Sequence, residues 1–245
     1  MADTAMPLFL RVSRATSTKS LIDILVLFAV SGLAFALENM ANARGWIVVA
    51  DDAHGVSAVV AGALAAVGMV FARGGSFADL GFKRPDRWLM VPVQVAAILG
   101  AFIAAQGLVP LLVSSFMTVP QPDMSRYAAI SGNVGAAVTL ALLLPLTASI
   151  PEEIIYRGFL IGRLTAIFGT KTRGVVLAVL TQALLFGAVH FQWGIGGMIM
   201  TVVMGIVWGT GYLLCGRNLW IVILAHSTGH VLFVIQLYLA KPLVI

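Results

Sequence analysis

Residues 149–163 read SIPEEIIYRGFLIGR, with two adjacent carboxylates, Glu152 and Glu153, and two arginines. The stretch lies within a longer run of mainly apolar residues, 134–168, that is suited to a membrane helix. A charged side chain at the centre of a bilayer costs about 2.5 kcal/mol or more. The sequence therefore predicts a buried polar site in the middle of a membrane-spanning helix.

The composition of the chain places it among membrane proteins. Of 245 residues, 60% are hydrophobic and 10% are charged, whereas about 25% of the residues of a soluble domain are charged. The length suits one domain, so we expect residues 1–245 to form a single integral membrane domain. The predicted fold is all-α: a polytopic membrane helix bundle with seven to eight transmembrane helices in contact with the lipid bilayer.

Apolar runs separated by polar turns mark the candidate membrane spans. Most approach the length of about 20 residues that a helix needs to cross the hydrocarbon core. A further apolar run, 108–116, is too short to cross alone. The candidate spans are Leu21–Leu37, Val56–Ala72, Leu89–Ala105, Val134–Phe168, Val175–His190, Ile195–Leu214 and Leu219–Ala240.

The first of these runs allows two interpretations. Basic residues precede it, and Ala41-Asn42-Ala43 resembles a signal-peptidase site. However, the basic leader is long, Asp23 interrupts the apolar run, and further spans follow. These features favour a retained first helix over a cleaved signal peptide.

The distribution of basic residues predicts the orientation in the membrane. With the N-terminus in the cytoplasm, most of the 15 Lys and Arg residues fall on the cytoplasmic side, with Arg163 at its edge. The net charge of +5 then serves contact with anionic lipid headgroups, and we expect no nucleic-acid partner. The Ala- and Gly-rich composition favours a bacterial protein, and hence the inner (plasma) membrane. The cytoplasmic set is Arg11, Arg14, Lys19, Arg73, Lys83, Arg84, Arg87, Arg157, Arg163, Lys171, Arg173 and Arg217, and Arg44, Arg126 and Lys241 fall outside.

Three of the four histidines, His190, His226 and His230, lie inside or at the edge of apolar segments. Ionisable side chains at this depth usually face a cavity of the bundle and have a function. His226 and His230 are four residues apart and share a helix face. Glu152 and His190 lie at equal sequence distances from Lys171, so antiparallel helices joined there would bring them to the same depth. Each histidine alone could also be only a hydrogen-bond partner of a neighbouring helix.

Glu153 and Arg157 are four residues apart in the order that favours a helical ion pair. Such a pair lessens the cost of burying both charges, which predicts a structural role for it. Pro145 and Pro151 precede the acidic pair and are expected to break or kink the helix there. Backbone groups freed in this way are tolerated where they line a cavity.

Three motifs in the second half of the chain resemble those of a known family. EEIIYR (Glu152–Arg157) resembles the EExxxR motif of the CAAX-protease and bacteriocin-processing (CPBP, or Abi) family of intramembrane endopeptidases. FGAVH (Phe186–His190) resembles its FxxxH motif, and the segment 205–230 is similar to its glycine-rich helix, short turn and final histidine helix. LGFKRPDRW (Leu80–Trp88) resembles a family loop that precedes a span. The catalytic motifs thus fall within residues 150–231.

The third motif departs from the family pattern. The family usually has HxxxN or HxxxD, whereas this chain has HxxxH with His230 in the last place. A histidine can still donate a hydrogen bond. It could also serve as an extra metal ligand, or mark an altered activity.

The resemblance implies hydrolysis of peptide bonds in a membrane-associated peptide or membrane-protein substrate. Glu152 would act as the general base on a water molecule that His190 helps to hold. His226 and His230 would face the scissile carbonyl and stabilise its oxyanion. The supporting residues would be Glu153, Arg157 and Phe186.

Two alternatives stay open at this point. In a metal-dependent version, Glu152, His190 and His226 would hold zinc and leave one position for water, although the glutamate-activated water without a cofactor is favoured. Outside enzyme function, the chain would be a catalytically silent family member that acts as a membrane binding or scaffold protein, or a small transporter.

Overall fold

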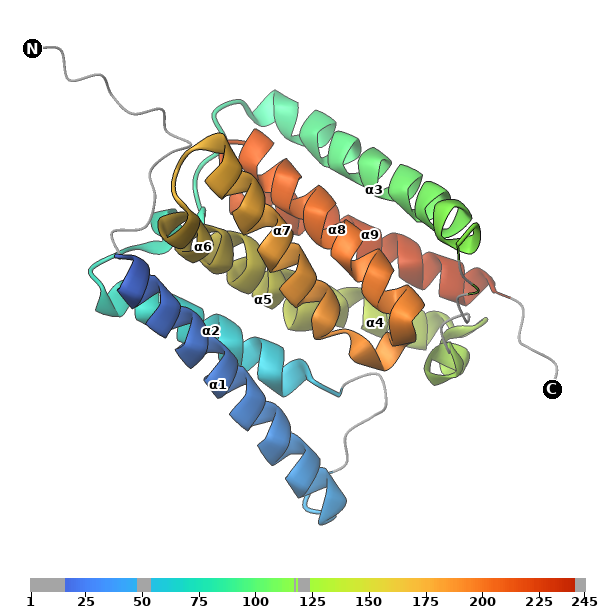
Figure 1. Cartoon of the computed structure of the whole chain (residues 1–245). Helices are drawn as coiled ribbons and strands as arrows, with labels where there is room; N and C mark the ends of the chain where they lie inside the picture. Colours follow the sequence, from blue (N-terminus) through green and yellow to red (C-terminus); the bar gives the residue numbers. More distant parts are fainter. Residues whose placement is uncertain (1–15, 48–53, 117, 119–123, 241–245) are drawn as a thin grey trace, which may run out of the picture.

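The structure, a computed structural model, describes residues 16–47, 54–116, 118 and 124–240. Within these ranges the chain is helical and contains no β-strand (Figure 1). Arg11, Arg14 and Lys241, which were assigned to sides of the membrane above, lie outside them. The α-helices are α1 (Ser17–Ala43), α2 (Val56–Ala72), α3 (Val91–Ser114), α4 (Val134–Leu144), α5 (Ile150–Glu153), α6 (Ile161–Phe168), α7 (Thr172–Ala188), α8 (Gly194–Leu214) and α9 (Leu219–Leu239).

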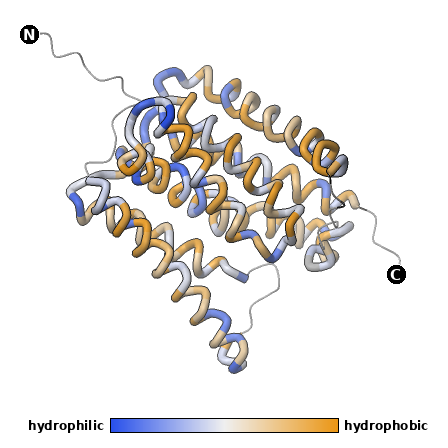
Figure 2. Tube along the Cα trace, in the orientation of Figure 1, coloured by the Kyte–Doolittle hydropathy of each residue, from blue (hydrophilic) through white to orange (hydrophobic). Residues whose placement is uncertain are grey.

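The lengths of the helices confirm the expectation of a polytopic membrane bundle. In the described part of the chain, five helical segments are long and apolar enough to cross a membrane, and two shorter apolar helices accompany them. The shorter ones, α2 and α7, have 17 residues each and span about 26 Å at 1.5 Å per residue. This is close to the hydrocarbon thickness of about 30 Å. Figure 2 shows hydrophobic residues along the helices and hydrophilic residues gathered at several connecting turns.

Helix α3 corrects one of the predicted spans. The run 108–116 is not a separate short segment, because a single helix continues from Val91 to Ser114 with Pro110 inside it. A proline in a helix interior removes one backbone hydrogen bond. In lipid, however, the remaining backbone groups must be satisfied within the helix. Gln106 and Gly107 therefore interrupt the apolar pattern without ending the helix.

The core of the bundle is one long helix that runs from Val134 to Phe168 through α4, α5 and α6. Every residue from 151 to 165 is buried, although this segment contains the acidic pair and two arginines. Helices α2, α7, α8 and α9 contact it from different sides, and Figure 1 shows α5 between α2 and α7. Apolar side chains on the outer faces are exposed instead, as Leu142 is at 66%. Charge faces inward and apolar surface faces outward, as expected in lipid.

A buried ionic cluster attaches the first helical hairpin to this central helix. Asp23 of α1 accepts hydrogen bonds from Arg73 at the end of α2 and from Arg163 of α6, the latter over 2.8 Å. These bonds raise the pKa of the Arg73 guanidinium, so Arg73 stays charged. Arg163, expected at the cytoplasmic edge, is 6% exposed and packs over the ring of Phe159 at 4.6 Å. Asp23 therefore compensates two cations from different helices.

A loop before α3 fixes the start of α9. The carbonyl of Gly81 accepts from the backbone N–H of Leu219 over 2.7 Å, and Asn218 Nδ2 donates to the carbonyl of Lys83 over 3.0 Å. Gly81 has a φ of +98°, and a Cβ there would lie 2.7 Å from the carbonyl oxygen of Arg217. Glycine is required at this position because the backbone is left-handed and the neighbouring chain is close. The contact sets the position of the helix that carries two of the histidines.

Close packing of α7 against α8 sets the position of the third histidine. A Cβ at Gly205 would lie 2.7 Å from the Cα of Ala183, so the two helices meet backbone to backbone. Gln182, which is fully buried, donates to the carbonyls of Gly205 over 2.7 Å and of Val179 over 3.0 Å. This interface orients α7, at whose end His190 lies.

The ionic cluster gives a prediction for stability. Asp23→Asn removes the carboxylate that accepts from buried Arg163, so we expect a loss of about 3 kcal/mol in the free energy of unfolding. Arg73→Gln is the matched control, because the Arg73 side chain is 31% exposed and its loss should cost about 1 kcal/mol or less. Thermal unfolding of the purified protein in detergent compares the two variants. Equal melting temperatures for them would contradict the assignment of Asp23 as the anchor of the hairpin.

Candidate active site

Two π-helical turns flank the acidic pair in the central helix. The first is Pro145–Ser149 and the second is Ile154–Leu160, and the single α-helical turn α5 lies between them. The sequence predicted a break or kink at the prolines at 145 and 151, but the helix continues through both. The backbone continues with wider hydrogen-bonded turns, a feature that is frequent at functional sites. Each π turn changes which side chains share a face, so it adjusts the directions in which residues 149–157 point.

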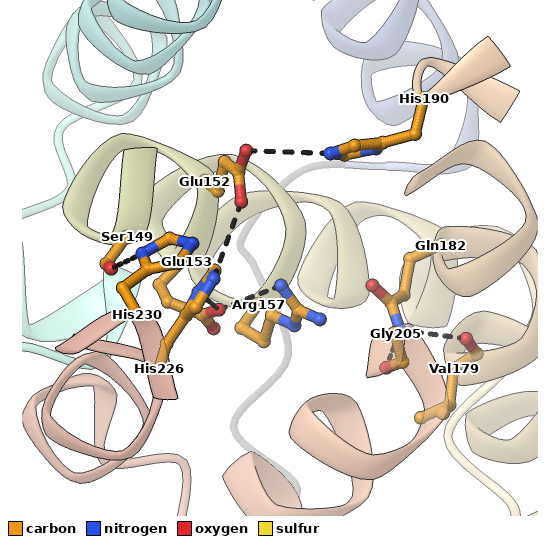
Figure 3. A network of polar contacts seen from close by, with 10 residues as sticks. All are labelled: Ser149, Glu152, Glu153, Arg157, Val179, Gln182, His190, Gly205, His226 and His230. Atoms are coloured by element: carbon orange, nitrogen blue, oxygen red, sulfur yellow. Dashed lines mark hydrogen bonds and ion pairs between the residues drawn. The ribbon is translucent and has the colours of Figure 1, made fainter. Parts of the chain in front are cut away.

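Glu153 forms the centre of a buried polar cluster. Its Oε1 accepts from Nη1 of Arg157 over 2.9 Å and from Nδ1 of His226 over 2.8 Å (Figure 3). Glu153 and Arg157 are both 0% exposed, and His226 is 2% exposed. The predicted ion pair is therefore present, and it extends to a histidine from α9. Because a carboxylate accepts hydrogen bonds, this contact places a proton on Nδ1 of His226.

Phe186 supports Arg157 from α7. The guanidinium carbon of Arg157 lies 4.8 Å from the centre of the Phe186 ring, which is fully buried. A cation over an aromatic face is attracted by the ring quadrupole. The same ring makes edge contacts with Tyr156 at 4.6 Å and with His190 at 4.9 Å. The first residue of the FxxxH motif thus links the buried cation to the histidine of that motif.

Glu152 points in a different direction from Glu153 and lies between two imidazoles. Its Oε1 is 4.0 Å from Nε2 of His190, and its Oε2 is 3.8 Å from Nε2 of His226 (Figure 3). Both distances exceed the range of about 2.7–3.2 Å for a direct hydrogen bond. Nε2 of His226 is buried and has no hydrogen-bond partner among the described residues. Polar groups separated in this way suit a bridging water molecule.

His190 lies just beyond the end of α7, in the turn that leads to α8. Its Nδ1 is 2.7 Å from the carbonyl oxygen of Phe186. A carbonyl can only accept, so Nδ1 of His190 is protonated and Nε2 points at Glu152. The predicted convergence of Glu152, His190 and His226 is therefore found in the structure.

His230 is held by a residue that the sequence did not single out. Its Nδ1 lies 2.9 Å from Oγ of Ser149, a fully buried serine one turn before Glu152. The rings of His226 and His230 have centres 4.5 Å apart, as their spacing on one helix face predicts. Trp208 of α8, also fully buried, stacks on His226 with ring centres 5.7 Å apart. A lone serine and a lone tryptophan in apolar segments give no signal by which either could have been found.

A cavity of about 1600 Å³ opens beside this cluster. Glu152 and the histidines at 190, 226 and 230 belong to its wall, and the rest is mainly apolar side chains from α1, α2, α3, α8 and α9. Ligand cavities are commonly about 300–1,000 Å³ with a few polar groups among apolar ones. Glu152 is the one carboxylate of the described lining. The cavity is thus large enough for a peptide segment and presents a single acid to it.

The arrangement of the side chains also bears on the zinc alternative. Within the described ranges, no group of three or more His, Cys, Asp or Glu side chains is placed so that it could hold a metal ion. Glu152 turns one oxygen to each imidazole (Figure 3). The two imidazole nitrogens and the carboxylate therefore do not converge on one point. The predicted zinc set, Glu152, His190 and His226, therefore does not fit a metal ion in this geometry.

Comparison with known proteins gives a family match that covers the site. Residues 134–232 match a family model described as type II CAAX prenyl endopeptidase Rce1-like. The match runs from the start of α4 into α9 and so includes every residue of the polar cluster. It confirms the resemblance to the CAAX-protease family and points to CAAX-type intramembrane protease activity. No curated protein and no solved structure gave a match.

The buried ion pair predicts a large effect on stability. Arg157→Met leaves the carboxylate of Glu153 buried without its cation, and we expect it to lower the free energy of unfolding by about 3–5 kcal/mol. Adding Glu153→Gln should restore part of this loss, since the unpaired charge is then removed. The midpoints of denaturation in detergent measure the stability of Arg157→Met and of the double variant. If the double variant is no more stable than Arg157→Met alone, the unpaired carboxylate is not the source of the loss.

Proposed function

We propose that this protein is an intramembrane endopeptidase that hydrolyses a peptide bond with a water molecule activated by Glu152. The observation that carries the proposal is the position of Glu152 in the cavity, 4.0 and 3.8 Å from the Nε2 atoms of His190 and His226. A water molecule within about 2.8 Å of two acceptors spans about 4.4 Å between them, given its H–O–H angle. The gap of 4.0 Å between Glu152 and His190 is close to that separation.

The protonation of His190 favours a water molecule held in a productive orientation. With its proton on Nδ1, neutral His190 offers only an acceptor at Nε2, and the Glu152 carboxylate also only accepts. A water molecule between them donates both of its hydrogens and keeps an oxygen lone pair free for attack. Glu152 acts as the general base in this arrangement, and His190 orients the nucleophile.

The reaction follows from these positions. The water oxygen attacks the scissile carbonyl carbon while one water proton moves to Glu152. The tetrahedral intermediate then expels the amine, which takes the proton from Glu152 as the C–N bond breaks. His226 and His230 face the carbonyl oxygen and stabilise its negative charge. Since Nδ1 of His226 already donates to Glu153, His226 donates from Nε2 in its imidazolium form, whose charge Glu153 offsets.

The charges of the buried cluster support this role of His226. Glu152 and Glu153 carry two negative charges and Arg157 carries one positive charge. A proton on His226 makes the group neutral, which favours its burial in a low-dielectric environment. No cofactor is needed for these steps. Zinc held by Glu152, His190 and His226 would require these side chains to rearrange from the geometry described above, and a metal measurement tests this alternative.

The substrate class follows from the cavity and the family. We assign a membrane-associated peptide or a membrane protein as substrate, because the apolar walls accept an apolar peptide segment within the bilayer. The whole chain, 1–245, would act as one integral membrane domain with its catalytic residues within 150–231. We place it in the bacterial inner membrane with the N-terminus in the cytoplasm.

The activity predicts a clear result for alanine variants. Glu152→Ala, His190→Ala and His226→Ala should each reduce cleavage at least about 100-fold, because general-base catalysis and oxyanion stabilisation each contribute about that much or more. Comparative peptidomics of membranes from cells with the wild-type or variant protein measures this, and metal analysis of the purified protein accompanies it. Peptide patterns that are identical for all four proteins would contradict protease activity and favour a silent binding protein or a transporter. Stoichiometric zinc that is lost in the variants would favour the metal-dependent mechanism.

The orientation predicts opposite locations for the ends of the bundle. Counting the central helix as one crossing, the described helices cross the membrane an odd number of times, so a reporter fused after residue 245 should face the outside. Alkaline phosphatase fused there is expected to be active, and green fluorescent protein fused there is expected to be dark. A fluorescent fusion at this end would contradict the assigned orientation.

A further inference from the structure

Ser149 differs from several threonines of the central helix, α8 and α9. Several threonines in these helices donate to the carbonyl oxygen four residues earlier, over 2.6 to 2.9 Å. Ser149 is 0% exposed, and in the described part of the chain the hydrogen-bond partner of its Oγ is Nδ1 of His230, at 2.9 Å. The threonines with the local bond are Thr147, Thr165, Thr201 and Thr228.

Ser149 is the last residue of the first π turn. The backbone N–H of Ile150 donates to the carbonyl of Pro145, five residues earlier. This carbonyl is the one that a serine at 149 would otherwise reach, because it lies four residues before it. Ser149 does not share this carbonyl, and its hydroxyl is directed at Nδ1 of His230 on α9 instead. A hydroxyl next to the acidic pair thus contacts a histidine on another helix.

We infer that Ser149 donates its hydroxyl proton to Nδ1 of His230 and thereby places the ring proton of His230 on Nε2. A fully buried hydroxyl proton needs an acceptor, and Nδ1 of His230 is the acceptor that the structure places beside it. Among the described residues, His230 forms no ion pair with a carboxylate, in contrast to His190 and His226. A neutral imidazole that accepts at one nitrogen carries its proton on the other. Ser149 is therefore a positioning residue that sets the tautomer of His230.

The consequence is a division of roles among the three imidazoles. His190 and His226 have their protons fixed on Nδ1 by the Phe186 carbonyl and the Glu153 carboxylate. Among the three, His230 alone presents an N–H to the cavity while neutral. If the proposed peptidase mechanism holds, this Nε2–H is the neutral donor to the oxyanion, beside the imidazolium of His226. Figure 3 shows the His230 ring next to Ser149 on one side and close to His226 on the other.

The tautomer can be measured without any substrate. We would label the imidazole nitrogens with ¹⁵N and record the spectrum of the full-length protein in lipid nanodiscs at about pH 8, above the usual His pKa of about 6.5. His230 should carry its proton on Nε2, and His190 should carry its proton on Nδ1 and serve as the internal reference. In Ser149→Ala, the His230 signals should shift toward a mixture of both tautomers. A proton on Nδ1 of His230 in the wild type, or no change in Ser149→Ala, would overturn the inference.

Cleavage of a fluorescence-quenched farnesylated CAAX peptide gives the second measurement. Ser149→Ala should lower kcat about tenfold with little change in KM, as expected for the loss of one buried hydrogen bond. In a His230→Asn background the same substitution should cost no more than about twofold, because an amide carries N–H donors that need no tautomer. Thr228→Val is the control, since its hydroxyl donates to the carbonyl of Leu224 within α9, and it should leave kcat unchanged.

The outcomes separate this inference from the proposed function. An equal loss in both backgrounds would show that Ser149 supports the fold alone, and would overturn the inference even if the protein is a protease. If the wild type does not cleave the peptide, the proposed activity fails for this substrate class, while the nitrogen spectra still decide the tautomer.

Discussion

The structure depends on the burial of one ion pair, Glu153 with Arg157, in the middle of the membrane bundle. Removing both charges from water costs several kcal/mol per ion, and their contact over 2.9 Å offsets part of that cost. The remainder requires partners from other helices. Phe186 of α7 covers the guanidinium, and His226 of α9 donates to the carboxylate. The pair can be buried only if these helices pack as they do, and this packing brings His226 to Glu152.

Adjacent residues with the same side chain thus have opposite environments. Glu153 is fully buried and has hydrogen-bond partners at 2.8 and 2.9 Å. Glu152 belongs to the cavity wall, and the nearest imidazole nitrogens stand 3.8 and 4.0 Å away. The first carboxylate has two protein hydrogen bonds at its Oε1, whereas the second can interact with a water molecule or a substrate. Pre-organised catalysis requires a reactive group that is held in place and still free to contact the substrate. Glu153 helps to hold the helix, and Glu152 has no direct hydrogen bond to either imidazole.

The sequence predicted those features that depend on local periodicity, and it missed those that depend on contacts between distant segments. Helical spacing was sufficient for the pair Glu153–Arg157 and for the shared face of the two histidines on α9. The bond between Asp23 and Arg163 joins the first helix to the central one, and no local pattern marks it. The π turns and the role of Ser149 also escaped prediction, because they arise where the central helix packs against α9. The histidine at 230, which departs from the family motif, contacts that serine over 2.9 Å.

The most direct test of this account is an experimental structure of the protein in lipid at a resolution that shows ordered water. We predict one water molecule within hydrogen-bond distance of the Glu152 carboxylate and Nε2 of His190, and its absence in Glu152→Ala. A metal ion coordinated by Glu152, His190 and His226, or a Glu152 side chain turned away from the cavity, would contradict the proposed mechanism.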